Sequence, residues 1–378
     1  MARAVRQIRA ALRRTPAAQV AAPVAGLVGG ALSSGAAEAV TLPEDRAEAL
    51  YHVYDGGGVR ASGPALLVRK SLFDKVSLSG SYYVDMVSNA SIDVVTTASP
   101  FKETRNEYGI GLDYVYRDAL LNLSVTRSKE PDYLADGVSM DVSQEVFGGM
   151  TTITLGYSRG ADKVGRKGDV GYFDHAKHWR YRTGVTQILT PRWLASLNLE
   201  AVSDDGFLGS AYRAARVFGA AVPERNPRTR SSRSIKLGSV AEIMPRTSIQ
   251  GSYRYFYDTW DIKAHTLEFG ASKYVGESFL IDATLRYYKQ GHALFYSDNA
   301  LAETAYVSRN RQLSAFHSIA PGAKVTYVYK QVPGQYEIKA HLNYEYIQYK
   351  FSDFTDIRTG KPYDYGAHVL QLMATATF

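Results

Sequence analysis

A short cluster of acidic and imidazole side chains could bind a metal ion. Asp174, His175 and His178 supply carboxylate and imidazole ligands at close spacing. The cluster lies where a polar segment leads into an alternating segment, so a solvated polar surface is the competing interpretation. We expect no metal site here, because a lone cluster at such a position is more often polar surface.

A histidine between two serines raises a second possibility. His317 lies close to Ser314 and Ser318, and a serine nucleophile with a histidine base would make a lipase. No acidic partner and no nucleophile-elbow motif accompany them. Acid–base or calcium roles could also be assigned to two carboxylate pairs, Asp204-Asp205 and Asp258/Asp261. We expect these to be solvated or linked to lipopolysaccharide through divalent ions, and we expect no enzyme.

The chain has no cysteine. This excludes disulfides, thiolate metal sites, a lipid-anchored N-terminus and haem attachment through a Cys-x-x-Cys-His motif. No cofactor is expected. No apolar run of 18 residues follows residue 39, so no transmembrane helix is expected.

The elements that position these side chains are alternating segments. In residues 335–346 the apolar set is Tyr336, Ile338, Ala340, Leu342, Tyr344 and Tyr346, and the intervening residues are polar or charged. The same alternation recurs along most of the chain, with charges opposite Tyr and Leu. This pattern is typical of strands with lipid on one side and water on the other.

The last strand carries the clearest signal. Leu370, Leu372, Ala374, Ala376 and Phe378 share one face, and Thr and Gln dominate the other. A final strand that ends on an aromatic resembles the signature that the barrel-assembly machinery of the outer membrane reads. We therefore assign Leu370, Leu372 and Phe378 to an assembly signal.

Connections alternate between short turns and long loops. Long loops are expected near residues 89–103, 161–175, 204–229, 291–308 and 351–364. We count sixteen strands, the first near residues 46–54. An even count keeps both termini of the chain in the periplasm, and fourteen is the alternative if the first hairpin lies outside the wall. The prediction is an all-β, transmembrane, antiparallel up-and-down β-barrel.

The first 39 residues look like a secretory signal peptide. Five arginines precede an Ala-, Val- and Gly-rich stretch, and residues 37–39 fit a small-x-small cleavage site. The domains are then residues 1–39, removed, and 40–378, the barrel. The net charge is +7, and the removed segment carries most of it. No nucleic-acid partner is therefore expected.

Four segments go beyond generic barrel patterning: residues 54–58 (YDGGG), 63–70 (GPALLVRK), 82–88 (YYVDMVS) and 91–100 (SIDVVTTASP). Together they resemble a domain-of-unknown-function family of Gram-negative outer-membrane proteins. The resemblance implies a barrel in the outer membrane and assigns no catalytic residue. Its relatives imply a link to a flavin transferase and small periplasmic redox proteins.

The inward faces carry many ionisable groups. The predicted pore-lining residues are Asp85, Glu107, Asp113, His178, Arg180, Arg182, Arg254, Asp282, Arg286, Glu337, Lys339, His341 and Glu345. Arg117 is also placed inside. The loop at 204–229 and the strand after it are rich in arginine, and the loop could constrict the pore or contact lipopolysaccharide.

We expect a porin-like outer-membrane channel for small polar solutes. The alternative is a sealed barrel that acts as a scaffold for a periplasmic redox or flavoprotein system, and a hydrolase is the weaker alternative. The expected partners are the outer membrane with its lipopolysaccharide, the barrel-assembly machinery and, by analogy with porins, further copies of the chain.

Overall fold

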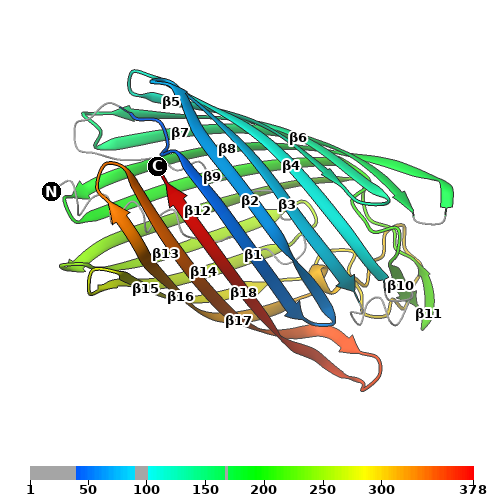
Figure 1. Ribbon diagram of the computed structural model, residues 1–378. Coiled ribbons are helices and arrows are strands. Elements are labelled where there is room, and N and C mark those ends of the chain that lie inside the picture. Colours follow the sequence, from blue (N-terminus) through cyan, green and yellow to red (C-terminus); the bar gives the residue numbers. More distant parts are fainter. Residues whose placement is uncertain (1–39, 90–100, 167–168) are drawn as a thin grey trace.

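The computed structural model describes residues 40–89, 101–166 and 169–378 (Figure 1). The predicted signal peptide and the segment 91–100 lie outside these residues. The strands are β1 (Arg46–Gly56), β2 (Val59–Phe73), β3 (Val76–Asn89), β4 (Phe101–Tyr116), β5 (Ala119–Lys129), β6 (Tyr133–Val146), β7 (Thr151–Arg166), β8 (Asp169–Thr190), β9 (Trp193–Gly206), β10 (Ala214–Val217), β11 (Ala220–Pro223), β12 (Thr229–Met244), β13 (Thr247–Asp258), β14 (Lys263–Val275), β15 (Phe279–Gln290), β16 (Phe316–Val332), β17 (Tyr336–Asp356) and β18 (Lys361–Thr377).

All strands except β10 and β11 form one closed antiparallel barrel. Each pairs with its neighbours in sequence, apart from β9, which pairs with β12 across the β10–β11 hairpin. The first strand closes the barrel against the last, with Arg46 opposite Thr377 and Gly56 opposite Ala367. The predicted sixteen-stranded barrel, with its first strand at residue 46, is confirmed. Closure removes every free sheet edge from the wall.

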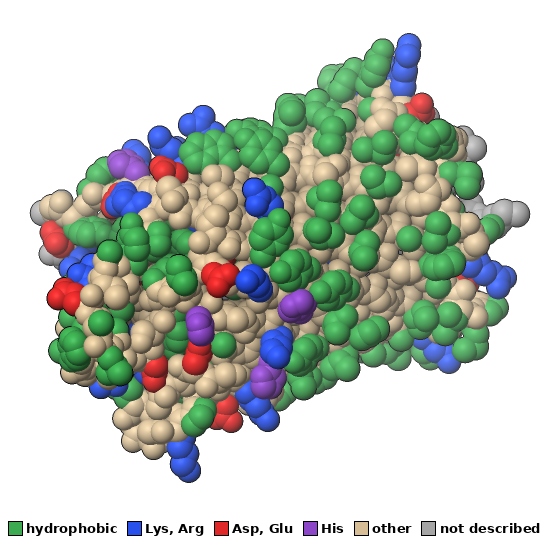
Figure 2. Space-filling model, turned by 180° about the vertical axis from the view of Figure 1, so that it is seen from behind, with side chains coloured by type: hydrophobic (Ala, Val, Ile, Leu, Met, Phe, Trp, Pro, Cys, Tyr) green, Lys and Arg blue, Asp and Glu red, His purple; other side chains and the backbone are tan. Residues whose placement is uncertain are grey.

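The outer face of the barrel is apolar. Alternate residues along each strand, such as Ile110, Leu155 and Phe269, keep large exposed hydrophobic side chains, while their sequence neighbours face inward. Figure 2 shows hydrophobic side chains over much of this face, with most of the charged and histidine side chains in the left half of the view. An exposed apolar belt of this extent is typical of a lipid-facing surface.

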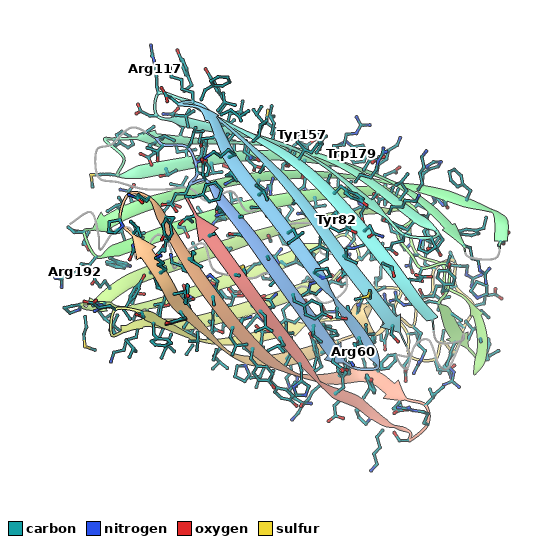
Figure 3. The ribbon with its side chains drawn as sticks, viewed as in Figure 1. Arg60, Tyr82, Arg117, Tyr157, Trp179 and Arg192 are labelled. Carbon is teal, nitrogen blue, oxygen red and sulfur yellow. The ribbon has the colours of Figure 1, made fainter. Side chains whose placement is uncertain are left out.

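Two ends of the barrel can be distinguished. We call the end with the short turns and Phe378 the turn end, and the end with β10 and β11 the loop end (Figure 1). Arg117 and Arg192 lie in turns at the turn end (Figure 3). The prediction that Arg117 faces the lumen is wrong, because it occupies the β4–β5 turn with a positive φ of 54°.

Strands on the loop side run longer than predicted. Residues 161–166 and 169–175 belong to β7 and β8, and residues 351–356 and 361–364 belong to β17 and β18, although loops were expected there. Lys163 lies opposite His175, for example, in the same register as the rest of the hairpin. Backbone pairing continues beyond the apolar belt with polar side chains on the outer face, so the lipid-facing pattern disappears before the strand ends.

Loop segments cover part of the loop end. The β10–β11 hairpin lies there, and isolated bridges join Val217 to Ala300 and Arg225 to Val307. The segment between β15 and β16 contains the 3-10 helix η1 (Arg311–Leu313). We call residues 291–315 the mouth loop. No helix in the described part of the chain is long and apolar enough to span a membrane.

Candidate functional site in the barrel lumen

The predicted pore-lining residues all lie on the inward face, because each occupies the strand position opposite to the exposed apolar set. Figure 3 places Tyr157 and Trp179 on the outer wall, and the residues on either side of Trp179, His178 and Arg180, face inward. The structure therefore brings the predicted charges to one surface. It pairs His178, Arg180 and Arg182 with carboxylates on nearby strands, which is one of the two interpretations that the sequence left open for this basic ladder.

Several ion pairs cross over an intervening strand. Arg182 on β8 reaches Asp141 on β6 at 2.9 Å, and β7 between them contributes Gly156. A Cβ at Gly156 would lie 2.3 Å from Asp141 Oδ1 and 2.9 Å from Arg182 Nε. Glycine is therefore required at this position to let the two charged groups meet.

Other pairs repeat this arrangement over small side chains. Lys236 on β12 binds Glu268 on β14 at 3.1 Å, and Ser252 of the intervening β13 donates to the same carboxylate at 2.9 Å. Arg286 on β15 binds Glu345 on β17 at 2.7 Å across β16. These pairs fix the positions of the charged groups along the inward face.

Exposure differs between the two sides of the lumen. The inward charges on β8, β9, β12 and β13 are accessible: side-chain exposure is 46% for Arg180, 37% for Arg182, 30% for Lys236 and 25% for Arg254. On β2 and β4, by contrast, Arg69 and Asp113 form a pair at 3.3 Å in which each side chain is only 1% exposed. The lumen therefore has a solvent-accessible side and a packed side.

The packed side holds a second buried group. His52 Nε2 lies 2.7 Å from Asp85 Oδ1, and Arg105 binds the other oxygen of Asp85 at 3.0 Å. The Tyr83 ring stacks on His52 at 4.8 Å. Asp85 was predicted to face inward, whereas His52, Arg69 and Arg105 were missed, although the same parity rule on β1, β2 and β4 identifies them.

The suspected metal cluster does not assemble. His178 faces inward and is bridged by two carboxylates, Asp204 at Nδ1 (2.8 Å) and Asp162 at Nε2 (2.9 Å). His175 lies on the opposite, outward face of β8, and Asp174 binds Arg228. Both nitrogens of the one inward histidine are thus occupied by carboxylates.

The suspected hydrolase residues are also separated. Ser318 is buried on the inward face of β16, whereas His317 lies on the outward face. Ser314 donates to the carbonyl of Arg311 inside the mouth loop. The carboxylate pair Asp258/Asp261 is likewise divided, since Asp258 binds Arg230 and Asp261 binds Lys263.

A carboxylate cluster at the loop end was not anticipated. Ligand atoms of Glu103, Glu130 and Asp132 lie within 4.8 Å of one another, which is close enough for a cation. The Tyr212 hydroxyl donates to Asp132, so the segment before β10 reaches across to the β5–β6 turn. Within the part of the chain that the structure describes, this is where three such groups converge.

The mouth loop is held by buried arginines. Arg309 donates to the Thr355 carbonyl at 2.6 Å and lies over the Phe354 ring. Arg311 donates to the Gly57 carbonyl at 3.2 Å and lies over the Tyr365 ring at 5.0 Å. The loop is therefore fixed to β17, β18 and the β1–β2 turn at the loop end.

The arginine-rich segment 204–229 is held by ion pairs as well. Arg228 binds Asp174 with two hydrogen bonds of 2.7 and 2.8 Å, which raise the pKa of its guanidinium. Arg225 approaches Glu303 of the mouth loop at 3.5 Å. These ion pairs connect the segment between β11 and β12 to β8 on one side and to the mouth loop on the other.

Comparisons with known proteins agree with this architecture. Residues 24–355 match a family described as a protein of unknown function (DUF3570). A search of curated proteins finds no significant match. Similar solved structures include a bacterial polysaccharide outer membrane secretin (10% identity, TM-score 0.50, 88% of this chain and 98% of that chain). They also include OmpT, an outer membrane protein of Vibrio cholerae (9% identity, TM-score 0.46, 89% of this chain and 97% of that chain).

The siderophore receptor PirA from Pseudomonas aeruginosa is similar as well (12% identity, TM-score 0.46, 83% of this chain and 60% of that chain). This chain spans about 60% of that receptor's length. At these identities the likeness extends to the fold alone. The fold is that of outer-membrane barrels, as expected from the sequence.

Proposed function

Because this chain belongs to the DUF3570 family of proteins of unknown function, we propose a function from the barrel itself: a porin-like channel of the bacterial outer membrane. It passes small polar solutes by diffusion and performs no chemistry. The outer-membrane location is supported by the closed barrel, its apolar outer belt and the final strand that ends at Phe378.

One observation carries the proposal. The ionic side chains on the inward faces of β8, β9, β12 and β13 keep a quarter to nearly half of their exposure. Charges of this kind would carry a large desolvation cost in a dry core. A closed barrel of sixteen strands is wide enough for an aqueous interior. The exposure of these charges therefore supports a water-filled path along this side.

The pairing of the charges predicts weak ion selectivity. Arg180 and Arg254 both approach Glu200, at 3.7 and 3.6 Å, so cations and anions meet a mixed field. The mouth loop restricts the entrance on the β17–β18 side. We therefore expect a narrow, weakly selective channel whose size limit is set by the mouth loop.

Solute uptake into vesicles tests this function. Purified protein is refolded into phospholipid vesicles, and swelling is followed in neutral sugars of increasing size. We expect swelling with the smallest sugars, and faster swelling with larger sugars in Arg311→Ala, because that change removes the contacts of the mouth loop with Gly57 and Tyr365.

Arg358→Ala serves as the matched control, since Arg358 is exposed and binds Asp356 near the tip of the β17–β18 hairpin. It should behave as wild type. Vesicles that hold folded protein but never swell would overturn the channel.

The buried pairs favour a second candidate. Arg69–Asp113 and His52–Asp85 make the β1–β4 side a solid wall, and the mouth loop and the hairpin cover part of the loop end. A barrel closed in this way would act as a scaffold for a periplasmic redox partner at its turn end. Co-purification of a flavoprotein or haem protein, with no solute uptake, would favour this candidate.

A further inference from the structure

A row of basic side chains crosses the outer face of the barrel near the loop end. Its members are direct cross-strand partners on the four successive strands β14 to β17: His265, Lys289, His317 and Lys350. We call them the basic row. All four lie on the outward, apolar-bearing face, and Figure 2 shows Lys, Arg and His side chains gathered along the edge of the apolar surface.

The positive charge of this row is at most partly balanced by the protein. Side chains directly opposite in an antiparallel pair have Cβ atoms about 5 Å apart, and like charges there destabilise the sheet. Lys289 and Lys350 flank His317, and neither lysine forms an ion pair within the described part of the chain. The register continues to Asp364 on β18, which can balance the charge of Lys350 at most.

Cations in the lumen differ from the basic row, since Arg182 and Lys236, for example, each contact a carboxylate. The contrast indicates that the outer row is arranged for a partner that is not part of the chain. That partner must be anionic and must reach the outer wall.

The position of the row identifies where the partner lies. One step towards the turn end, the outward residues on β14, β15 and β16 are Leu267, Tyr287 and Ile319, all exposed and apolar or aromatic, and the outward residue on β17 is Gln348. One step towards the loop end they become polar, as at Lys263 and Ser352. The row therefore marks the border of the apolar belt, the depth at which lipid headgroups lie.

Aromatic contacts reinforce this border. The Tyr253 hydroxyl and His265 Nδ1 are 2.8 Å apart, and the Tyr287 and His317 rings are 6.3 Å apart. Tyrosines with one apolar and one polar end are typical of the membrane interface. They also hold both imidazoles beside the lysines.

We propose that the basic row binds the phosphate-bearing headgroup of one lipopolysaccharide molecule in the outer leaflet. The lysine ammonium groups and the imidazole N–H groups donate to phosphate oxygens, and the acyl chains lie along Leu267, Tyr287 and Ile319. The row spans three strand spacings, about 14 Å, which is long enough to meet more than one phosphate of the same headgroup. The inference rests on the proposed outer-membrane location, but not on channel activity.

Lipid binding to charge-reversed variants tests the inference. Protein refolded in detergent is titrated with lipopolysaccharide, with phosphatidylglycerol and with inorganic phosphate, and bound lipid is counted by native mass spectrometry. We expect wild type to retain one lipopolysaccharide. Lys289→Glu/Lys350→Glu should bind it about thirtyfold more weakly or worse, since each cation near the headgroups contributes to binding.

The matched control is Arg159→Glu/Lys177→Glu on β7 and β8. These residues also face outward near the loop end, but Arg159 lies opposite Val138 and Trp179, and Lys177 lies opposite Asp205. The control should bind as wild type does. Unboiled gel mobility verifies folding, and Lys289→Gln/Lys350→Gln replaces the reversed variant if that variant does not fold.

Equal binding by wild type and the row variant would overturn the inference. Equal affinity for phosphatidylglycerol, or displacement by inorganic phosphate, would overturn the assignment to lipopolysaccharide. A row variant that loses the lipid while solute uptake is unchanged supports the inference. Failure of solute uptake with lipid binding intact would count against the channel alone.

Discussion

A charge placed on the lipid face at mid-depth should destabilise the barrel strongly. Leu372 faces outward with 51% exposure and lies opposite Tyr51 and Leu342. It is six residues from Phe378, and at 3.3 Å per residue on a strand tilted by about 40° this places it about 15 Å above the turn-end border. That is the middle of an apolar belt about 25–30 Å tall.

Leu372→Arg is therefore expected to lower the free energy of unfolding by about 2–4 kcal/mol, the cost of a cation at the bilayer midplane. The assay is urea unfolding of protein refolded into phospholipid vesicles, followed by tryptophan fluorescence. Unboiled gel mobility reports how much protein reaches the folded barrel. Leu372→Asp should likewise impair assembly, with a smaller free-energy change.

Gln371→Arg is the matched control. Gln371 is the preceding residue, faces inward and accepts a hydrogen bond from Asn343 at 3.2 Å. A charge there meets the lumen, so we expect a change within about 1 kcal/mol. Equal losses for the two variants, or a larger loss for Gln371→Arg, would refute the assignment of the two faces.

Three further predictions concern the charged network. Gly156→Ala should lower the free energy of unfolding by about 1–3 kcal/mol, because the added Cβ collides with the Asp141–Arg182 ion pair. Gly80→Ala should not lower it, because no atom lies within 4 Å of the Cβ added there. Equal effects of the two changes would contradict this reasoning. Asp113→Asn should cost about 3–5 kcal/mol in urea unfolding by leaving Arg69 unpaired, and the double change Arg69→Met/Asp113→Leu should recover most of the loss; no recovery would mean that packing rather than charge is responsible. Arg228→Ala should speed proteolysis of residues 207–228, because it removes the ion pair with Asp174. An unchanged cleavage rate would show that this ion pair does not hold the segment in place.

The wall of the barrel was predictable because its physics is local. Each strand has lipid on one side and water on the other, so apolar and polar residues alternate along it. The first strand, residues 46–56, follows from the requirement for an even number of strands. The loop-side extensions were not predictable. Beyond the belt both faces meet water, and Lys163 opposite His175 carries no lipid-facing signal although the backbone pairing continues.

The candidate site was predictable only as a list of inward residues. Parity places Asp141 and Arg182 inside, but they are 41 residues apart in the sequence and meet only because β7 carries glycine between them. The basic row was missed for a related reason. His265, Lys289, His317 and Lys350 look like isolated polar positions until the register aligns them.

Single-channel recording in planar lipid bilayers tests the central claim most directly. Purified protein, shown to be folded by its unboiled gel mobility, should give discrete ohmic conductance steps. Arg311→Ala should give larger steps than wild type, because it releases the mouth loop from Gly57 and Tyr365. Folded protein that inserts into the bilayer and gives no steps, in wild type and in Arg311→Ala alike, would contradict a channel along the β8–β13 side of the lumen.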